Sequence, residues 1–180
     1  MLNPLFCIAP PTLANLIPMN LAPHNLQVAL LQPEIAPNTG NIGRLCVATG
    51  TRLHLVRPLG FVLSDQKLKR SGMDYWDRLN LTLHDDDETF FNSIQNANVW
   101  LFSSKAQRTI WDAKFTDNDI LIFGSETKGI SQRVKDRFPT RQLLIPQTAN
   151  ERCLNLSTAV GIGLYEALRQ LCAPTNAMSR

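Results

Sequence analysis

Four polar segments of this chain combine residue types that could hold a phosphate or a nucleotide. In the first, 33–44 (PEIAPNTGNIGR), small residues precede Arg44, whose guanidinium could clamp phosphate or ribose oxygens. The segment lacks both the glycine spacing of a dinucleotide loop and the Lys-Ser/Thr pair of a P-loop. A tight turn and cap at Asn38, Gly40 and Asn41, opening a helix with an exposed arginine, explains these residues equally well.

The second and third segments, 102–105 (FSSK) and 123–130 (FGSETKGI), each follow an apolar run. Gly124 and Gly129 allow backbone conformations that other residues avoid, so the third segment could wrap an adenosine with backbone N–H and C=O groups. Glu126 could serve there as a helix cap partner or as a ligand contact. The alternatives are a glycine turn before the next helix and, for the second segment, an ordinary polar loop.

The fourth segment, 144–165 (LIPQTANERCLNLSTAVGIGLY), joins a strand end to the start of the last helix. Asn155 and Ser157 are residue types that cap helix N-termini, and a cap explains only one of them. It leaves unexplained a dense polar set between two apolar stretches, which comprises Asn150, Glu151, Arg152, Asn155 and Ser157.

Alternating strands and helices must position these segments. Apolar runs of strand length lie at 26–31, 52–56, 79–83, 99–102, 120–123 and 142–145. Helical patterns cover 41–49, 65–72, a start within the acidic run 85–88, a start near Ser131, and 156–171. This alternation predicts an α/β fold, with a mostly parallel sheet flanked by helices. The ligand crevice of such a sheet lies beyond the carboxyl ends of its strands, which is where the polar segments fall.

Composition limits the function classes. The chain has 180 residues with 44% hydrophobic and 18% charged residues, which suits one globular domain and excludes a disordered tail or a charged coiled coil. Its net charge of +3 does not by itself identify a nucleic-acid binder. No apolar run approaches the roughly 20 residues of a membrane span, so no membrane partner is expected.

Cysteines and histidines give no sign of a metal site. The four cysteines form no CxxC pair, which indicates reduced thiols in a cytoplasmic protein. The three histidines are spaced thirty residues apart, so no two share a helix turn as zinc ligands do.

The chain divides into one domain with short extensions. Residues 1–33 contain no Asp, Glu, Lys or Arg and six of the eleven prolines. We interpret 1–24 as an irregular or disordered extension, 25–173 as the domain and 174–180 as a C-terminal tail. A true translation start at Met19 is the alternative interpretation of the N-terminus.

Taken in order, the polar segments resemble the motifs of SPOUT-class tRNA 2'-O-methyltransferases of the TrmL/YibK type. NTGNIGR (38–44) is similar to the first family motif, FGSETKGI (123–130) to the second and IPQTANERCLNLSTAVGIGLYEA (145–167) to the third. The segment 60–75 (GFVLSDQKLKRSGMDY) resembles the stretch between motifs. The resemblance spans about 26–171 and implies a SPOUT methyltransferase domain, an α/β sheet whose C-terminal part forms a deep trefoil knot.

The resemblance also implies a cofactor and site residues. S-adenosylmethionine would bind in a bent form within the knot loops, without a metal. Carried over residue by residue, its contacts are Phe102, Gly124, Ile145, Cys153 and Leu154. Arg44 is the catalytic candidate, and residues that would support the substrate or the loops are Asn41, Glu126, Asn155 and Ser157. The family pattern has Ser at position 153 and a bulkier aliphatic at position 43, where glycine is expected to loosen the helix start.

The implied activity is methyl transfer to the ribose 2'-hydroxyl of the wobble nucleotide, position 34 of the tRNA anticodon loop, either cytidine or a modified uridine. A homodimer is implied, with Arg44 near the cofactor of the partner subunit. The expected RNA contacts are Lys67, Lys69, Arg70, Arg78, Lys105 and Lys128. The alternatives are methylation of another RNA position and a non-catalytic RNA-binding scaffold. The missing GxGxxG argues against a nicotinamide dehydrogenase.

Overall fold

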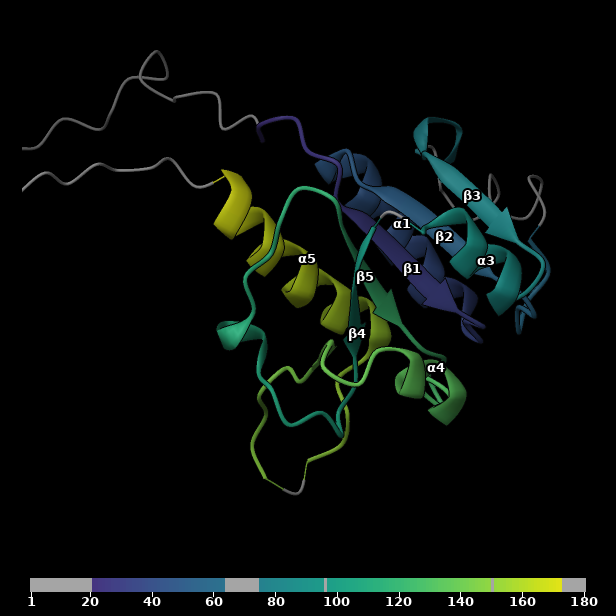
Figure 1. Ribbon diagram of the computed structural model, residues 1–180. Coiled ribbons are helices and arrows are strands. Elements are labelled where there is room, and N and C mark those ends of the chain that lie inside the picture. Colours follow the sequence, from purple (N-terminus) through teal and green to yellow (C-terminus); the bar gives the residue numbers. More distant parts are fainter. Residues whose placement is uncertain (1–20, 64–74, 96, 150, 173–180) are drawn as a thin grey trace, which may run out of the picture.

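A parallel β-sheet forms the centre of the molecule (Figure 1). The computed structural model describes residues 21–63, 75–95, 97–149 and 151–172. Within these residues the sheet has the strand order β3-β2-β1-β5-β4-β6, and each neighbouring pair runs parallel. The strands are β1 (Gln27–Leu31), β2 (Arg52–Val56), β3 (Leu81–His84), β4 (Asn98–Phe102), β5 (Asp119–Phe123) and β6 (Gln142–Leu143).

Helices cover both faces of this sheet, because successive side chains of each strand point to opposite faces. Val28 and Leu30 of β1 pack in one apolar core with α1 (Ala36–Thr49) and α5 (Leu156–Cys172). Ala29 and Leu31 pack in the other core with α3 (Asp87–Ser93) and α4 (Gln132–Arg137). Two short 3₁₀ helices, η2 (Trp76–Arg78) and η3 (Ile110–Asp112), lie in the connections.

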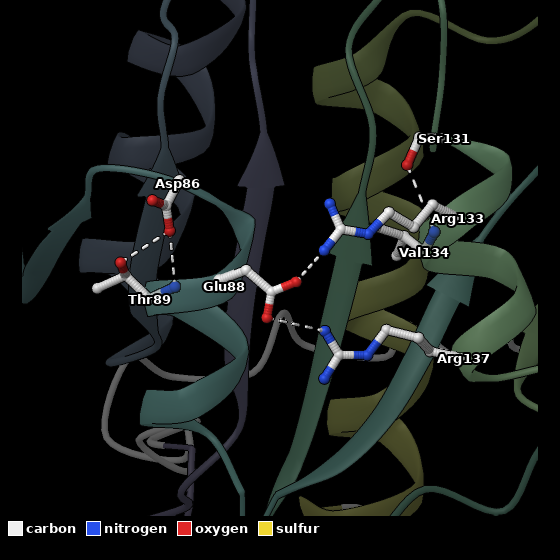
Figure 2. A network of polar contacts seen from close by, with 7 residues as sticks. All are labelled: Asp86, Glu88, Thr89, Ser131, Arg133, Val134 and Arg137. Carbon is white, nitrogen blue, oxygen red and sulfur yellow. Dashed lines mark hydrogen bonds and ion pairs between the residues drawn. The ribbon is translucent and has the colours of Figure 1, made fainter.

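Helices α3 and α4 are capped and joined to each other (Figure 2). The Asp86 side chain accepts a hydrogen bond from the backbone N–H of Thr89 at the start of α3, and Ser131 caps α4. Glu88 of α3 forms ion pairs with Arg133 and Arg137 of α4, the second at 3.9 Å. Thus the helix that follows the 124–130 loop is tied to its neighbour on the same face.

The observed sheet confirms the predicted parallel α/β architecture with helices on both faces. Each predicted strand is present, although β3 begins at Leu81 and β6 ends at Leu143, beyond which Leu144 keeps an isolated bridge to Thr109. The predicted last helix matches α5 closely. The deep trefoil knot stays a prediction at this point.

The predicted start of the first helix was wrong. Helix α1 begins at Ala36, with Pro37 in its first turn, so Asn38, Gly40 and Asn41 are helical rather than a turn. Its N-cap residue, Ile35, makes no side-chain cap bond. Gly43 sits buried within the continuous helix and does not loosen its start. Gly50 ends the helix with a φ of 72°, as a left-handed C-cap.

Several expectations fall outside the described residues. These are the helix at 65–72 with Lys67, Lys69 and Arg70, the polar residue Asn150, residues 1–20 of the extension, and the tail. No helix in the described ranges has both the length and the apolar character to cross a membrane.

Candidate functional site

A cavity of about 530 Å³ opens at the carboxyl ends of β4, β5 and β6. Parallel strands place their following loops at one edge of the sheet, and here the start of α5 closes the space beside them. All five residues predicted to contact a cofactor line this cavity, namely Phe102, Gly124, Ile145, Cys153 and Leu154. The structure therefore brings together residues as far apart in the chain as Phe102 and Leu154.

The 124–130 loop folds back tightly on itself. Ser125 and Gly129 form an isolated antiparallel bridge, and the Gly129 N–H donates to the Ser125 carbonyl at 2.9 Å. A Cβ on Gly124 would lie 2.1 Å from the carbonyl carbon of Gly129, so only glycine fits there. Gly129 itself has a φ of +66°, which glycine adopts at little cost. The two glycines thus shape this wall of the cavity.

Glu126 joins this loop to the start of α1. Its carboxylate accepts hydrogen bonds from the backbone N–H groups of Glu34 and Ile35, at 2.8 and 3.3 Å, and from the Asn38 side chain at 2.9 Å. In return, the Glu34 carboxylate accepts from the backbone N–H and the hydroxyl of Thr127. Glu126 thus ties this loop to the backbone just ahead of α1, and it also lines the cavity, so its predicted ligand contact stays a prediction.

Asn155 extends the network to α5. Its side-chain oxygen accepts from the backbone N–H and the hydroxyl of Ser157, at 2.8 and 2.7 Å, which caps the helix. Its amide group donates to the Asn38 side-chain oxygen at 2.9 Å. Ser157 supports this cap and is not part of the cavity lining, whereas Asn155 is. Asn38, 117 residues away from Asn155, connects both helices to Glu126.

Aromatic rings form the floor between the sheet and α5. Phe102 and Phe123 stack with ring centroids 4.4 Å apart, and both rings line the cavity. Gly163 of α5 faces them: a Cβ there would lie 2.7 Å from the Phe102 ring. The missing side chain lets α5 approach the two rings closely.

Three lysines give the cavity lining positive charge. Lys105 and Lys128, both predicted to contact RNA, line it together with Lys135 of α4. Glu126 adds negative charge, although its carboxylate accepts several N–H hydrogen bonds. Such a lining favours a ligand that carries anionic groups.

Arg44 and Asn41 do not contribute to this cavity. Both are exposed on α1, and the Arg44 guanidinium lies over the ring of Tyr75 at 5.2 Å from its centroid. Arg78, also predicted to contact RNA, is exposed on η2 away from the lining. Arg44 therefore stays a predicted catalytic residue that the cavity lining does not include.

Cysteine environments differ sharply. Cys153 is exposed and lines the cavity, whereas Cys46 lies on the buried face of α1. Burial raises the pKa of the Cys46 thiol to about 12, so this thiol stays protonated and unreactive. Cys153 places a thiol, a weak S–H donor, at the cavity wall.

Histidines that are distant in sequence meet in the sheet. His54 Nδ1 lies 2.9 Å from His84 Nε2, and His54 Nε2 lies 2.8 Å from the Gln27 side-chain oxygen. Across the described ranges, no three His, Cys, Asp or Glu side chains are grouped so as to hold a metal ion.

Comparisons with known proteins add to this geometry. The model of the SpoU rRNA Methylase family matches residues 25–165. The chain belongs to this family. It is 42% identical to the tRNA (cytidine(34)-2'-O)-methyltransferase of Methylovorus glucosotrophus over 79% of the chain and 94% of that protein. It is 39% identical to the enzyme of the same name from Escherichia coli K12, over 83% and 96%.

Solved structures agree with the family assignment. One described as giving structural insights into the 2-OH methylation of C/U34 on tRNA is 45% identical, with a TM-score of 0.78, and covers 83% of this chain and 98% of its own. The SpoU methyltransferase AviRb from Streptomyces viridochromogenes, solved with the cofactor AdoMet, has a TM-score of 0.73 at 22% identity. It covers 86% of this chain and 61% of its own, and it supports the fold alone.

Family membership confirms the resemblance predicted from the three motifs and makes this SpoU-family chain a methyltransferase. Sequence reasoning missed the contributions of Glu34, Asn38, Tyr75 and Lys135. Asn38 and Tyr75 lay inside segments that carried the resemblance, which is the signal that pointed to them. Nothing in the sequence distinguished Glu34 or Lys135 from other surface charges.

Proposed function

We propose that this chain transfers a methyl group from S-adenosylmethionine to the ribose 2'-hydroxyl of nucleotide 34 in a tRNA anticodon loop. The observation that carries the proposal is the similarity, over nearly their whole length, to two enzymes named for that reaction. The cavity supports it, since the five positions carried over as cofactor contacts meet there. An RNA-modifying enzyme of this kind would work in the cytoplasm.

The volume and the apolar walls of the cavity suit S-adenosylmethionine, whereas its lysines suit the phosphates of an RNA substrate. Its volume lies within the roughly 300–1,000 Å³ of small-molecule sites. Phe102, Ile145 and Leu154 offer apolar walls to a purine, and the loop that contains Gly124 and Gly129 contributes to the rest of the lining. When bound, this cofactor supplies an electrophilic methyl group on a sulfonium, which needs no metal.

Arg44 would orient the reacting ribose. A guanidinium stays protonated at neutral pH, so its role is to position the nucleotide and to stabilise negative charge that develops on the 2'-oxygen. Ideal alignment can supply about 7–11 kcal/mol of the barrier reduction. Lys105, Lys128 and Lys135 would contact phosphates near the cavity, which makes tRNA affinity sensitive to salt.

A homodimer would place Arg44 of one subunit beside the cavity of the other. Arg44 is exposed and outside the lining of its own cavity, as such a composite site requires. Ile162 and Tyr165 on α5 are 38% and 54% exposed, and large hydrophobic side chains of this kind suit a two-fold interface. We propose that α5 contributes to this interface.

We also propose the deep trefoil knot of the resembled family for the C-terminal part. The Leu144 N–H donates to the Arg108 carbonyl at 2.7 Å, and the Ile110 N–H donates to the Leu144 carbonyl. Gln170 of α5 bonds Phe115 and Ala113. The 103–118 loop thus contacts the chain both before and near the end of α5. The knot would be contradicted by an experimental structure in which the path of the backbone between the two termini is unknotted.

The function is tested with tRNA from a strain that lacks methylation at nucleotide 34. Purified dimer and labelled S-adenosylmethionine should incorporate label into this tRNA, and nucleoside mapping should place it at position 34. Label at another position, or only in ribosomal RNA, would favour the related methyltransferases. Absence of label together with no heat on titrating S-adenosylhomocysteine would favour a non-catalytic RNA-binding scaffold.

A further inference from the structure

We propose that Tyr75 is a positioning residue for Arg44, holding its guanidinium in the orientation that the reaction needs. The inference rests on the proposed function, because it requires Arg44 to act on the ribose. Tyr75 contacts neither the cavity nor any reacting group of its own subunit, and its effect would pass through Arg44.

An exposed arginine needs such support. Arg44 lies on the outer side of α1, and the part of the chain that the structure describes provides it with no carboxylate partner. A free arginine side chain populates many rotamers, and each must be given up when the guanidinium engages a substrate. The ring of Tyr75 lies 5.2 Å from the guanidinium carbon, within the range of a cation–π contact.

Tyr75 is itself held rigidly. Its side chain is buried, with only 4% of the residue exposed, and its hydroxyl donates to the Gly40 carbonyl at 2.5 Å. In an α-helix, the carbonyl of residue 40 also accepts the backbone N–H of residue 44. The Tyr75 hydroxyl is therefore bonded to the same helical turn that carries Arg44. This bond holds the ring in a fixed position relative to the backbone of Arg44.

Gly43 provides the space for this arrangement. A Cβ at position 43 would lie 3.4 Å from the Tyr75 ring and 3.3 Å from both Trp76 and Leu79. These are tighter than most Cβ contacts, so a larger residue would push the aromatic pair away from the helix. The absence of a side chain at Gly43 thus allows the Tyr75 ring to sit close beside the helix that carries Arg44.

A double-mutant cycle tests the inference in the full-length dimer. Tyr75→Leu removes the ring face and the hydroxyl but keeps an apolar side chain, and Arg44→Lys keeps a cation that stacks less well. We expect Tyr75→Leu to lower kcat roughly tenfold to hundredfold, with S-adenosylhomocysteine affinity and the KM for tRNA changed less than threefold. In the Arg44→Lys background the same change should lower kcat by less than twofold.

Trp76→Leu is the matched control, because Trp76 packs on the same glycine without contacting the guanidinium. It should keep kcat within about twofold of the parent chain. If Tyr75→Leu fails to fold, Tyr75→Phe keeps the ring and should lose less than Tyr75→Leu does, roughly two- to fivefold in kcat.

The outcomes separate the two proposals. Two results would overturn the role of Tyr75 alone. One is an equal loss of kcat from Tyr75→Leu in the parent and Arg44→Lys backgrounds. The other is full kcat in both Tyr75→Phe and Tyr75→Leu while Arg44→Ala loses turnover. Unchanged turnover in Arg44→Ala would overturn the assigned role of Arg44 and this inference with it. Absence of methylation by the parent chain would instead reject the proposed function.

Discussion

Glu126 satisfies the start of a helix from a distant part of the chain. Its carboxylate accepts the backbone N–H groups of Glu34 and Ile35, which precede α1 and have no cap from their own segment. Charge-assisted bonds of this kind are stronger than neutral ones. A single residue of the cavity lining thus bonds the backbone ahead of α1 and also the Asn38 side chain, which in turn bonds Asn155.

Cys153 offers a chemical probe of the cavity. It is exposed and lines the space assigned to the cofactor, whereas the Cys46 thiol is buried with its pKa raised to about 12. We expect a small alkylating reagent to modify Cys153 and to leave Cys46 untouched in the folded protein. Saturating S-adenosylhomocysteine should slow modification of Cys153 at least about fivefold, as measured by peptide mass spectrometry.

The Cys153→Ser chain is the control for this experiment. It should lose the protected signal and retain cofactor binding, because the expected contact at position 153 is through the backbone. Equal labelling rates at Cys153 with and without S-adenosylhomocysteine would show that the cofactor does not bind next to Cys153.

Within α5, two glycines predict opposite effects of the same substitution. A Cβ at Gly163 would lie 2.7 Å from the Phe102 ring, whereas the nearest atom to a Cβ at Gly161 is 4.0 Å away. Gly163→Ala should therefore displace Phe102, destabilise the protein by about 1–3 kcal/mol and weaken S-adenosylhomocysteine binding. Gly161→Ala should stabilise it by up to about 1 kcal/mol through helix propensity.

Urea unfolding and calorimetric titration of the two variants measure these effects. Equal losses of unfolding free energy in Gly161→Ala and Gly163→Ala would show that the contact with Phe102 does not determine the effect of the substitution. If Gly163→Ala keeps its affinity for S-adenosylhomocysteine, the stacked rings of Phe102 and Phe123 do not contribute to cofactor binding.

Neighbouring strands create a pH dependence of stability. Burial, together with the nearby His84 and Arg52 charges, lowers the pKa of His54 to about 4, and burial also lowers the pKa of His84. Between pH 6.5 and about 4 the unfolded chain binds more protons than the folded one, so stability falls as pH falls. We expect His54 to cost the fold about 2 kcal/mol between pH 7 and pH 5.

Urea unfolding across this pH range checks the expectation. His54→Gln should flatten the dependence, while His24→Gln, outside the pair, should leave it in place. An identical slope in the His54→Gln chain would mean that other groups control the acid sensitivity.

Elements could be predicted from sequence where their own residues determine them. The buried strands could be predicted because short apolar runs between polar loops are characteristic of a parallel sheet. Helix α5 could be predicted from the helical spacing of its apolar residues. The start of α1 could not be predicted, because the groups that satisfy it come from Glu126, about ninety residues away. The His54–His84 contact was missed for the same reason, since only the pairing of β2 with β3 brings the two side chains together.

At the scale of the molecule, the cavity lining could be predicted and its relation to Arg44 could not. Backbone contacts of a known motif carry over by position, which is why the five cofactor candidates meet. The position of Arg44 depends on how α1 is rotated about its own axis. That rotation depends on the packing of Ile42 and Cys46 in the core. Only the folded chain shows that Arg44 lies over the Tyr75 ring and is not part of the lining of its own cavity.

Mixed dimers test whether Arg44 acts on the partner's cavity. Arg44→Ala should abolish turnover, and Leu154→Trp should fill the cavity, so each homodimer is inactive. A dimer of one subunit of each kind has one site with an intact cavity and an intact arginine. Random mixing should therefore restore about a quarter of the parent activity.

Methylation assays after the two variants are unfolded together and refolded measure this recovery, and variants refolded separately and then kept apart are the control. No recovery, with mixed dimers verified by mass spectrometry, would place Arg44 and the cavity in the same subunit or remove Arg44 from the reaction.

The walls of the cavity are drawn from residue 35 through residue 159. A growing chain therefore contains β1 and α1 well before it contains every segment of this cavity, because β5, β6 and α5 follow them in the sequence. Copies that stop before α5 would lack Leu156 and Ala159 of this lining, and we expect them to methylate no RNA.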